Sequence, residues 1–143
     1  MPRPIRSIIE DQEVFSCPSQ TTVSEAALLM KRHEIGALMV VDDGKLVGVF
    51  TERDALFRVV AEGRDTQSTR LADVMTANPQ TIDPDKPFIN ALQMMHEGRY
   101  RHVPVVENGR PVGMISARDA LGPELEDFVY ELLRQEQMAD VLA

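Results

Sequence analysis

The hydrophobic positions in the first half of the chain predict a helix, two strands and a second helix. A capping-box pattern, Thr22-Val-Ser-Glu25, comes directly before an apolar stripe with helical spacing. The members of this stripe are Ala26, Leu29, Met30 and His33. The apolar runs 37–41 and 46–50, with a polar turn between them, indicate two short strands. A second helix is expected from Thr51 to just before Gly63.

The second half repeats this order after a polar linker at residues 64–69. Its helical stripe consists of Phe88, Ala91, Leu92 and Met95. The apolar runs 103–106 and 112–115 predict two strands, and Asn108-Gly109 between them is a strong hairpin signal. A short helix and a brief extended piece are expected before each long helix, at residues 4–10 and 14–17 and again at 70–75 and 79–82.

The two halves align without a gap at a spacing of 65 residues. Seven of the fifteen positions in 42–56 and 107–121 are identical, and extending the alignment to 26–41 adds four identities in sixteen positions. Unrelated sequences of ordinary composition would share about two identities over this length. The chain is therefore an internal duplication. Because about three strands with one covered face are barely stable alone, we expect an α/β (α+β) fold with repeats at 5–63 and 70–122 packed face to face around a common core.

One segment departs from the duplication. The last helix of the first repeat continues for about three turns, whereas its counterpart meets Gly122-Pro123, which ends a helix or starts a new one. Residues 123–143 then have the pattern of an amphipathic helix. Its apolar face consists of Leu125, Phe128, Val129, Leu132 and Leu133. Such a face usually packs on its own chain, but a helix beyond both repeats also suits contact with a second subunit.

Composition and charge narrow the possible functions. The net charge of −8 and the isoelectric point near 4.8 argue against general binding of DNA or RNA, which requires a basic surface. The sequence lacks an apolar run long enough for a membrane span, and the N-terminal residues lack the apolar region of a signal peptide. Cys17 is the single cysteine, which excludes an internal disulfide. These features predict a cytoplasmic protein.

Both repeats carry one motif where the second strand meets the following helix: Gly, two apolar residues, Thr or Ser, any residue, Arg and Asp. Its polar positions are Thr51, Arg53 and Asp54 in the first repeat and Ser116, Arg118 and Asp119 in the second. A helix N-terminus attracts phosphate through its free N–H groups and its dipole. The hydroxyl suits a phosphate oxygen, the carboxylate suits ribose hydroxyls, and the guanidinium adds a charge-assisted contact. The alternative is that Ser/Thr-x-x-Asp is only a helix cap, which a duplication would also copy.

With this motif in both repeats, the chain resembles a pair of cystathionine beta-synthase (CBS) domains, often called a Bateman module. The resemblance covers residues 5–121. Besides the repeated motif it rests on RHVPVV at 101–106 and on Asp73-Val-Met-Thr76, which is similar to the usual opening of a repeat. It implies two pseudo-symmetric βαββα repeats that commonly pair into a disc-like dimer.

The resemblance also implies two clefts between the repeats that bind an adenine nucleotide (AMP, ADP or ATP) as a regulatory ligand, or NAD or S-adenosylmethionine in some members. It gives the ribose contacts to Asp54 and Asp119, and the hydroxyl contacts to Thr51 and Ser116. Each cleft also borrows positions from the other repeat: Thr81, Ile82, Arg101 and His102 for the cleft of Asp54, and Ser16, Cys17, Gly36 and Ala37 for the cleft of Asp119. Because the second set carries no charge, phosphate-rich ligands are expected to favour the Asp54 cleft.

Neither catalysis nor a bound metal is predicted. The sequence contains no P-loop, HExxH or nucleophile-elbow pattern, and His33, His96 and His102 lack metal-ligand spacing. We therefore expect a non-enzymatic regulatory module that senses an adenine nucleotide, forms a homodimer and acts on a separate partner protein. The alternatives are a ligand-free dimerisation or interaction module and, less favoured, a small enzyme.

Overall fold

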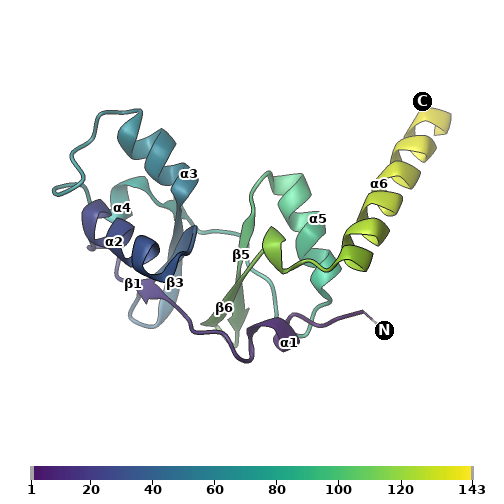
Figure 1. The fold of residues 1–143 in the computed structure, drawn as a ribbon, viewed down its shortest axis with the longest axis horizontal. Coiled ribbons are helices and arrows are strands. Elements are labelled where there is room, and N and C mark those ends of the chain that lie inside the picture. The colour runs from purple at the N-terminus through teal and green to yellow at the C-terminus, as the bar shows by residue number, and fades with distance from the viewer. Residues whose placement is uncertain (1, 143) are drawn as a thin grey trace.

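The first repeat of the computed structural model contains the elements that its hydrophobic pattern predicts (Figure 1). The structure describes residues 2–142. In order, the elements are α1 (Arg6–Ile9), β1 (Ser16–Cys17), α2 (Val23–His33), β2 (Ala37–Asp42), β3 (Lys45–Thr51) and α3 (Glu52–Asp54). The Thr22 hydroxyl accepts a hydrogen bond from the Glu25 N–H at 3.2 Å, so the predicted cap begins α2. The helix after Thr51 differs from the expected regular helix, because α3 continues as a π-helical segment, η1 (Ala55–Val60).

The second repeat has a similar order, except that the counterpart of β1 is a single bridge at Ile82, and it adds the long C-terminal helix. Its elements are α4 (Leu71–Val74), β4 (Thr76–Ala77), α5 (Phe88–Gly98), β5 (His102–Glu107), β6 (Arg110–Ser116), the 3-10 turn η2 (Ala117–Asp119) and α6 (Gly122–Leu142). Figure 1 shows α6 projecting away from the rest of the molecule. Among the helices of residues 2–142, none combines the length and the apolarity that crossing a bilayer requires.

The strand pairings repeat at the same spacing of 65 residues as the sequence. β1 runs parallel to β2 with Cys17 opposite Val40, and Ile82 forms the equivalent parallel bridge to Val105. β2–β3 and β5–β6 are antiparallel hairpins. Each has a register shift between two adjacent valines, Val40 and Val41 in the first hairpin and Val105 and Val106 in the second. β4 adds an edge strand to β3, which completes a four-stranded sheet in the order β1-β2-β3-β4. Register is therefore duplicated along with sequence.

Most of the buried apolar residues form two clusters, one for each repeat, so the expected single common core is wrong. Ala37, Met39 and Val49 are also buried but belong to neither cluster. One cluster holds Cys17, Val23, Ala26, Met30, Leu38, Val40, Phe50, Val59, Leu71 and Val74. The other holds Ile5, Ile9, Ile82, Phe88, Ala91, Leu92, Met95, Val103, Val105 and Ile115. Each cluster is completed by the short helix of the opposite repeat: α4 packs into the first repeat, and α1 packs into the second (Figure 1). The repeats are joined by this exchange of helices and by direct contact between β3 and β6.

Two identical glycines make room for the exchanged segments. A Cβ on Gly48 would overlap the Met75 Sδ and lie 3.0 Å from the Thr76 carbonyl oxygen. A Cβ on Gly113 would lie 2.7 Å from the Ile9 Cγ2 and 2.9 Å from the Gln12 Oε1. Both contacts are tighter than an added side chain tolerates, so the duplicated glycine is explained by the close approach of the other repeat.

Gln12 takes the place of an edge strand in the second repeat. Its side-chain Nε2 donates to the Met114 carbonyl at 2.7 Å, and its Oε1 accepts from the Met114 N–H at 2.9 Å. The corresponding edge of β3 is covered by the backbone of β4. One amide side chain thus satisfies the backbone of β6 next to the motif that begins at Gly113.

Candidate functional site

A cavity of about 500 Å³ lies where segments of both repeats meet. Its lining comes from the chain before β1, the end of α2 and start of β2, the start of α3, the start of β5, and the end of β6 with η2. The residues are Gln12, Glu13, Val14, Phe15, Glu34, Ile35, Gly36, Ala37, Met39, Glu52, Arg101, His102, Met114, Ser116, Ala117, Arg118 and Asp119. A cavity of this size suits a small organic ligand.

Two equivalent backbone hydrogen bonds join segments that line the cavity. The Glu52 N–H donates to the Gly36 carbonyl at 3.0 Å, and the Ala117 N–H donates to the Arg101 carbonyl at 3.1 Å. A Cβ on Gly36 would lie 3.3 Å from the Glu52 Oε1 and 3.5 Å from the His102 Cε1. The starts of β2, α3 and β5 are therefore in close contact, and an added side chain at Gly36 would crowd them.

The second motif presents its polar groups to this cavity. The Ser116 N–H donates to the Asp119 Oδ2 at 2.8 Å, and the Arg118 N–H donates to the Ser116 Oγ at 3.3 Å. Asp119 is partly exposed, and Arg118 is exposed. The cap orients the Asp119 carboxylate while leaving it accessible from the cavity.

The first motif has the same cap but a different environment. The Asp54 Oδ2 accepts from the Thr51 N–H at 3.1 Å, and the Asp54 N–H donates to the Thr51 Oγ1 at 3.1 Å. The Thr76 hydroxyl also donates to the Asp54 carboxylate at 3.3–3.4 Å, and the Arg58 Nε lies 3.6 Å from its Oδ1. Asp54 is 7% exposed. Its carboxylate is already satisfied by its own chain.

The structure brings together half of the predicted site residues. Those that line the cavity are Gly36, Ala37, Arg101, His102, Ser116, Arg118 and Asp119. Thr51, Arg53 and Asp54 do not line it, and Thr81 and Ile82 line a separate, more open hollow beside α5. Ser16 and Cys17 lie in β1 beside Met39 and Val40. Cys17 is buried, and burial raises the pKa of its thiol above the usual range.

The arrangement of the charged pair differs from the expected one. Arg101 and His102 were expected in the cleft of Asp54, but both line the cavity of Asp119. This places them beside Gly36 and Ala37, because β2 and β5 begin at the same meeting point of the repeats. The roles of these residues in nucleotide binding remain predictions.

Several lining residues were not predicted. Val14 and Phe15, which come directly before β1, line the cavity of Asp119 where Ser16 and Cys17 were expected. The Phe15 ring stacks on the His33 ring with centroids 4.0 Å apart. The feature of the sequence that could have indicated them is an adjacent apolar pair directly after the polar residues 10–13. The role of Glu52 in the lining could not be predicted from the sequence, because its counterpart in the second repeat is alanine. Only the fold shows that Glu52 lines the cavity.

The charges around the cavity are mostly negative. Glu13, Glu34, Glu52 and Asp119 line it together with two cations, Arg101 and Arg118. Burial lowers the pKa of His102 below its usual value, the two arginines lower it further, and the Glu52 and Asp119 carboxylates act in the opposite direction. His102 is therefore neutral near pH 7, and the lining carries more negative than positive charge.

This lowered pKa predicts a pH-dependent contribution to stability. Below about pH 6.5 the unfolded chain takes up a proton at His102 more readily than the folded chain does. The contribution of His102 to the free energy of unfolding is therefore fully present above this pH and is lost as the pH falls. Between about pH 7.5 and pH 5.5, we expect the free energy of unfolding in urea to fall more for the wild-type chain than for His102→Gln. His96→Gln is the control for removing a histidine. Equal losses for wild type and His102→Gln would contradict the prediction.

The family model for the CBS domain matches residues 5–61 and 71–123, which together make up more than half of the chain. This chain belongs to the CBS domain family. The two matches make it a CBS domain pair, which agrees with the internal duplication and confirms the resemblance found in the sequence.

Curated relatives support this assignment. The CBS domain pair is 35% identical over 115 residues to the CBS domain-containing protein YhcV of Bacillus subtilis, covering 80% of this chain and 81% of the relative. It is also 35% identical over 123 residues to the mitochondrial CBS domain-containing protein CBSX3 of Arabidopsis thaliana, covering 82% of this chain. It spans only 60% of the length of CBSX3, and 20% of the length of the Arabidopsis protein CBSCBSPB3.

Solved structures share the fold. The CBS domain pair of protein MJ0100, in complex with 5′-methylthioadenosine and S-adenosyl-L-methionine, is 25% identical with a TM-score of 0.73, covering 95% of this chain and 99% of that one. The CBS domain protein PAE2072 of Pyrobaculum aerophilum, complexed with AMP, is 24% identical with a TM-score of 0.79, covering 89% and 98%. The second likeness concerns the fold alone.

Proposed function

We propose that this CBS domain pair binds an adenine nucleotide in the cavity beside Asp119 and signals its occupancy to a separate partner protein, without catalysing a reaction. The observation that carries the proposal is the convergence of Arg101, Arg118 and Asp119 on one cavity that also has an apolar wall. The resemblance to CBS domain pairs assigns ribose hydroxyls to the Asp119 carboxylate, and we assign a phosphate to Arg101 and Arg118 because of their charge.

Each part of the ligand has a matching surface. Val14, Phe15 and Ile35 offer apolar contacts to a base, and the accessible Asp119 carboxylate suits a pair of ribose hydroxyls. Arg101 and Arg118 supply positive charge for a phosphate. This division of the lining follows the usual design of a small-molecule site, in which apolar area provides affinity and a few polar groups fix orientation.

The charge balance favours a ligand with few phosphates. Two arginines face four carboxylates, so each phosphate beyond the first adds more repulsion than attraction. We therefore place AMP ahead of ADP and ATP, which revises the expectation from sequence. A ligand such as S-adenosylmethionine, which MJ0100 binds, is the second candidate because its sulfonium is positively charged.

A thermal-shift panel tests the proposal. AMP, ADP, ATP, NAD and S-adenosylmethionine are added separately to the purified chain, and each is expected to raise the melting temperature according to its affinity. A ligand at 100 times its dissociation constant adds roughly 2.7 kcal/mol of stability. The absence of a shift with every member, together with a protein that releases no adenosyl compound on denaturation, would favour the ligand-free interaction module.

The proposal includes a homodimer. Apolar side chains are exposed in two parts of the chain: Leu28, Leu56, Phe57 and Val60 in the first repeat, and Leu125, Val129, Tyr130, Leu133, Met138 and Val141 on α6. Exposed apolar patches of this kind commonly mark protein–protein contacts. The regulated partner is expected to be a separate protein, and the cytoplasmic location remains a prediction from the sequence.

Removing α6 is expected to weaken the dimer. Sedimentation of the full chain should give about twice the 16.0 kDa of one chain, whereas a chain that ends at Leu121 should shift toward monomer because one apolar surface is missing. Leu133→Glu in the full chain tests the same surface without loss of the helix. An unchanged oligomer and unchanged stability in both variants would show that α6 does not contribute to association.

A further inference from the structure

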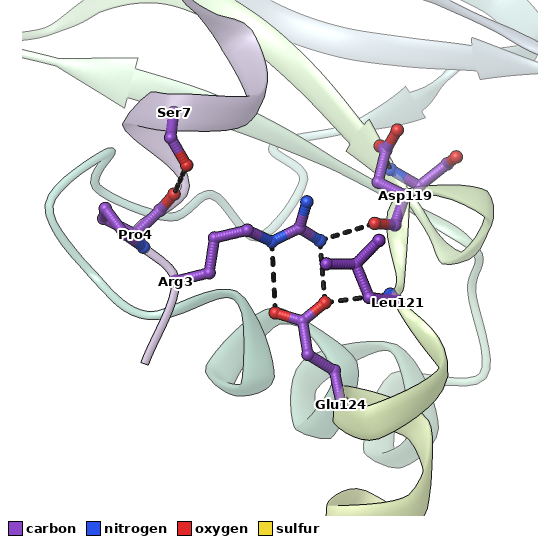
Figure 2. Close-up of polar contacts among 7 residues, drawn as sticks. Arg3, Pro4, Ser7, Asp119, Leu121 and Glu124 are labelled. Atoms are coloured by element: carbon purple, nitrogen blue, oxygen red, sulfur yellow. Dashed lines mark hydrogen bonds and ion pairs between the residues drawn. The ribbon is translucent and has the colours of Figure 1, made fainter. Parts of the chain in front are cut away.

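Asp119 is in contact with the cavity on one side and with the N-terminal segment on the other. Its carboxylate accepts from the Ser116 N–H beside the cavity, at 2.8 Å. Its backbone carbonyl accepts a hydrogen bond from the Arg3 guanidinium at 2.6 Å (Figure 2). A shift of this one residue therefore changes both the ligand-facing carboxylate and the contact with Arg3.

Arg3 also binds the first turn of α6. Its Nε lies 3.2 Å from the Glu124 Oε2, and its second amino group lies 2.7 Å from the Glu124 Oε1 (Figure 2). The Glu124 Oε1 additionally accepts from the Leu121 N–H at 2.9 Å, which caps the helix. The side chains of Arg3 and Glu124 are 28% and 17% exposed. A two-pronged ion pair in this environment is stronger than a surface pair.

Arg3 itself is held in place by the second repeat. Its carbonyl accepts from the Phe88 N–H at 2.9 Å, and its guanidinium lies 5.2 Å from the centroid of the Phe88 ring. Because Phe88 is fully buried at the start of α5, it provides a rigid base for the arginine. The guanidinium thus joins three elements: α5, η2 and α6.

The segment from Asp119 to α6 depends on this support. In the first repeat the chain continues from Asp54 directly into η1, and Arg58, one turn later, lies beside the Asp54 carboxylate. In the second repeat Ala120 is extended, with ψ of 134°, and the position equivalent to Arg58 is Pro123. The second repeat therefore lacks the counterpart of Arg58, and Arg3 supplies a cation at the junction between Asp119 and α6 instead. Arg3 and Glu124 both lie outside the residues that match the CBS domain model.

We propose that Arg3 is a positioning residue for the Asp119 cavity and that its bridge to Glu124 couples ligand binding to the anchoring of α6. The inference rests on the proposed function, because the ligand is an adenine nucleotide in that cavity. By thermodynamic linkage, an anchored α6 raises ligand affinity, and bound ligand stabilises the first turns of α6 by the same factor.

AMP is the probe for the test, and titration calorimetry on the full chain gives its dissociation constant. We expect Arg3→Ala to weaken AMP binding about tenfold, and Arg3→Lys to restore part of the affinity because lysine keeps the charge but cannot bridge both groups. Glu124→Gln keeps an acceptor for the Leu121 N–H and should weaken binding by a smaller factor. Arg6→Ala is the matched control, because Arg6 in the same segment pairs with Asp85 and Glu107 instead. It should change AMP affinity less than twofold.

Hydrogen exchange separates coupling from simple destabilisation. In the wild-type chain AMP should slow exchange of the amides in residues 121–128, and in Arg3→Ala this protection should be absent at saturating AMP. Folded variants that lose stability but keep wild-type AMP affinity and wild-type protection would overturn the inference, since Arg3 would then be only structural. A wild-type chain that does not bind AMP would overturn this inference, whereas the thermal-shift panel with the other ligands decides separately whether the proposed function stands.

Discussion

Replacing Asp119 by alanine is expected to weaken AMP binding by roughly 1.5–3 kcal/mol, a factor of about 10 to 150, while the chain stays folded. The carboxylate is the accessible acceptor of the cavity, and its single bond to the Ser116 N–H leaves capacity for ribose hydroxyls. The fold loses only a partly exposed cap.

Asp54→Ala is the matched variant at the equivalent position of the first repeat. Its carboxylate is buried and accepts from the Thr51 N–H and the Thr76 hydroxyl. Removing it leaves these donors unpaired, so we expect a loss of about 1–3 kcal/mol in the free energy of unfolding and an AMP affinity within twofold of the wild type.

The measurements are titration calorimetry with AMP and urea unfolding of both variants. Asp119→Asn and Asp54→Asn serve as controls of similar shape, since each keeps an oxygen acceptor for the cap. The opposite pattern, in which Asp54→Ala abolishes binding and Asp119→Ala only destabilises, would place the principal site in the cleft of Asp54. Two equal losses of affinity would indicate two occupied clefts.

The order of elements was predictable because local sequence determines it. The Thr22 cap, the helical stripe that contains Ala26 and Met30, and the Asn108-Gly109 turn each act over a few residues, and the structure contains α2 and the β5–β6 hairpin at the predicted places. The duplication then supplied a second observation of each element. The structure also contains the expected C-terminal helix, which begins at Gly122.

The arrangement of the repeats was not predictable in this way. The pattern of Leu71 and Val74 shows that α4 is amphipathic, but it cannot show that α4 packs on the first repeat rather than the second. The same exchange moves Val14 and Phe15 to the cavity and brings Arg101 beside Ala37. These are contacts between segments distant in sequence, and hydrophobic periodicity contains no information about them.

The π-helical segment η1 was not predictable for a similar reason. Thr51 and Asp54 form the predicted capping box, so the start of the helix was correct. Beyond it, Val59 is buried in the cluster that also holds Leu71 and Val74. The Arg58 guanidinium donates to the Met75 carbonyl at 2.8 Å. The helix that follows the first motif is thus held against α4, a contact with the opposite repeat that local propensity does not include.

The exchange of helices makes its own prediction. Leu71→Ala is expected to lower the free energy of unfolding by about 2–5 kcal/mol, because Leu71 is fully buried and its truncation leaves a cavity. Although Leu71 belongs to the second repeat by sequence, the loosened core should be that of the first. Native-state hydrogen exchange should therefore show lost protection in β2 and β3, while β5 and β6 keep theirs.

Ile5→Ala is the reciprocal variant and is expected to give the reverse pattern. Ile5 is also fully buried, but its neighbours Phe88, Val103 and Ile115 belong to the second repeat. Its truncation should cost a similar free energy and expose the amides of β5 and β6 first. If each variant loosens the repeat that contains it in sequence, the helices are not exchanged. If both variants loosen all four strands equally, the two clusters unfold as one cooperative unit, and the prediction that each repeat loosens separately is wrong.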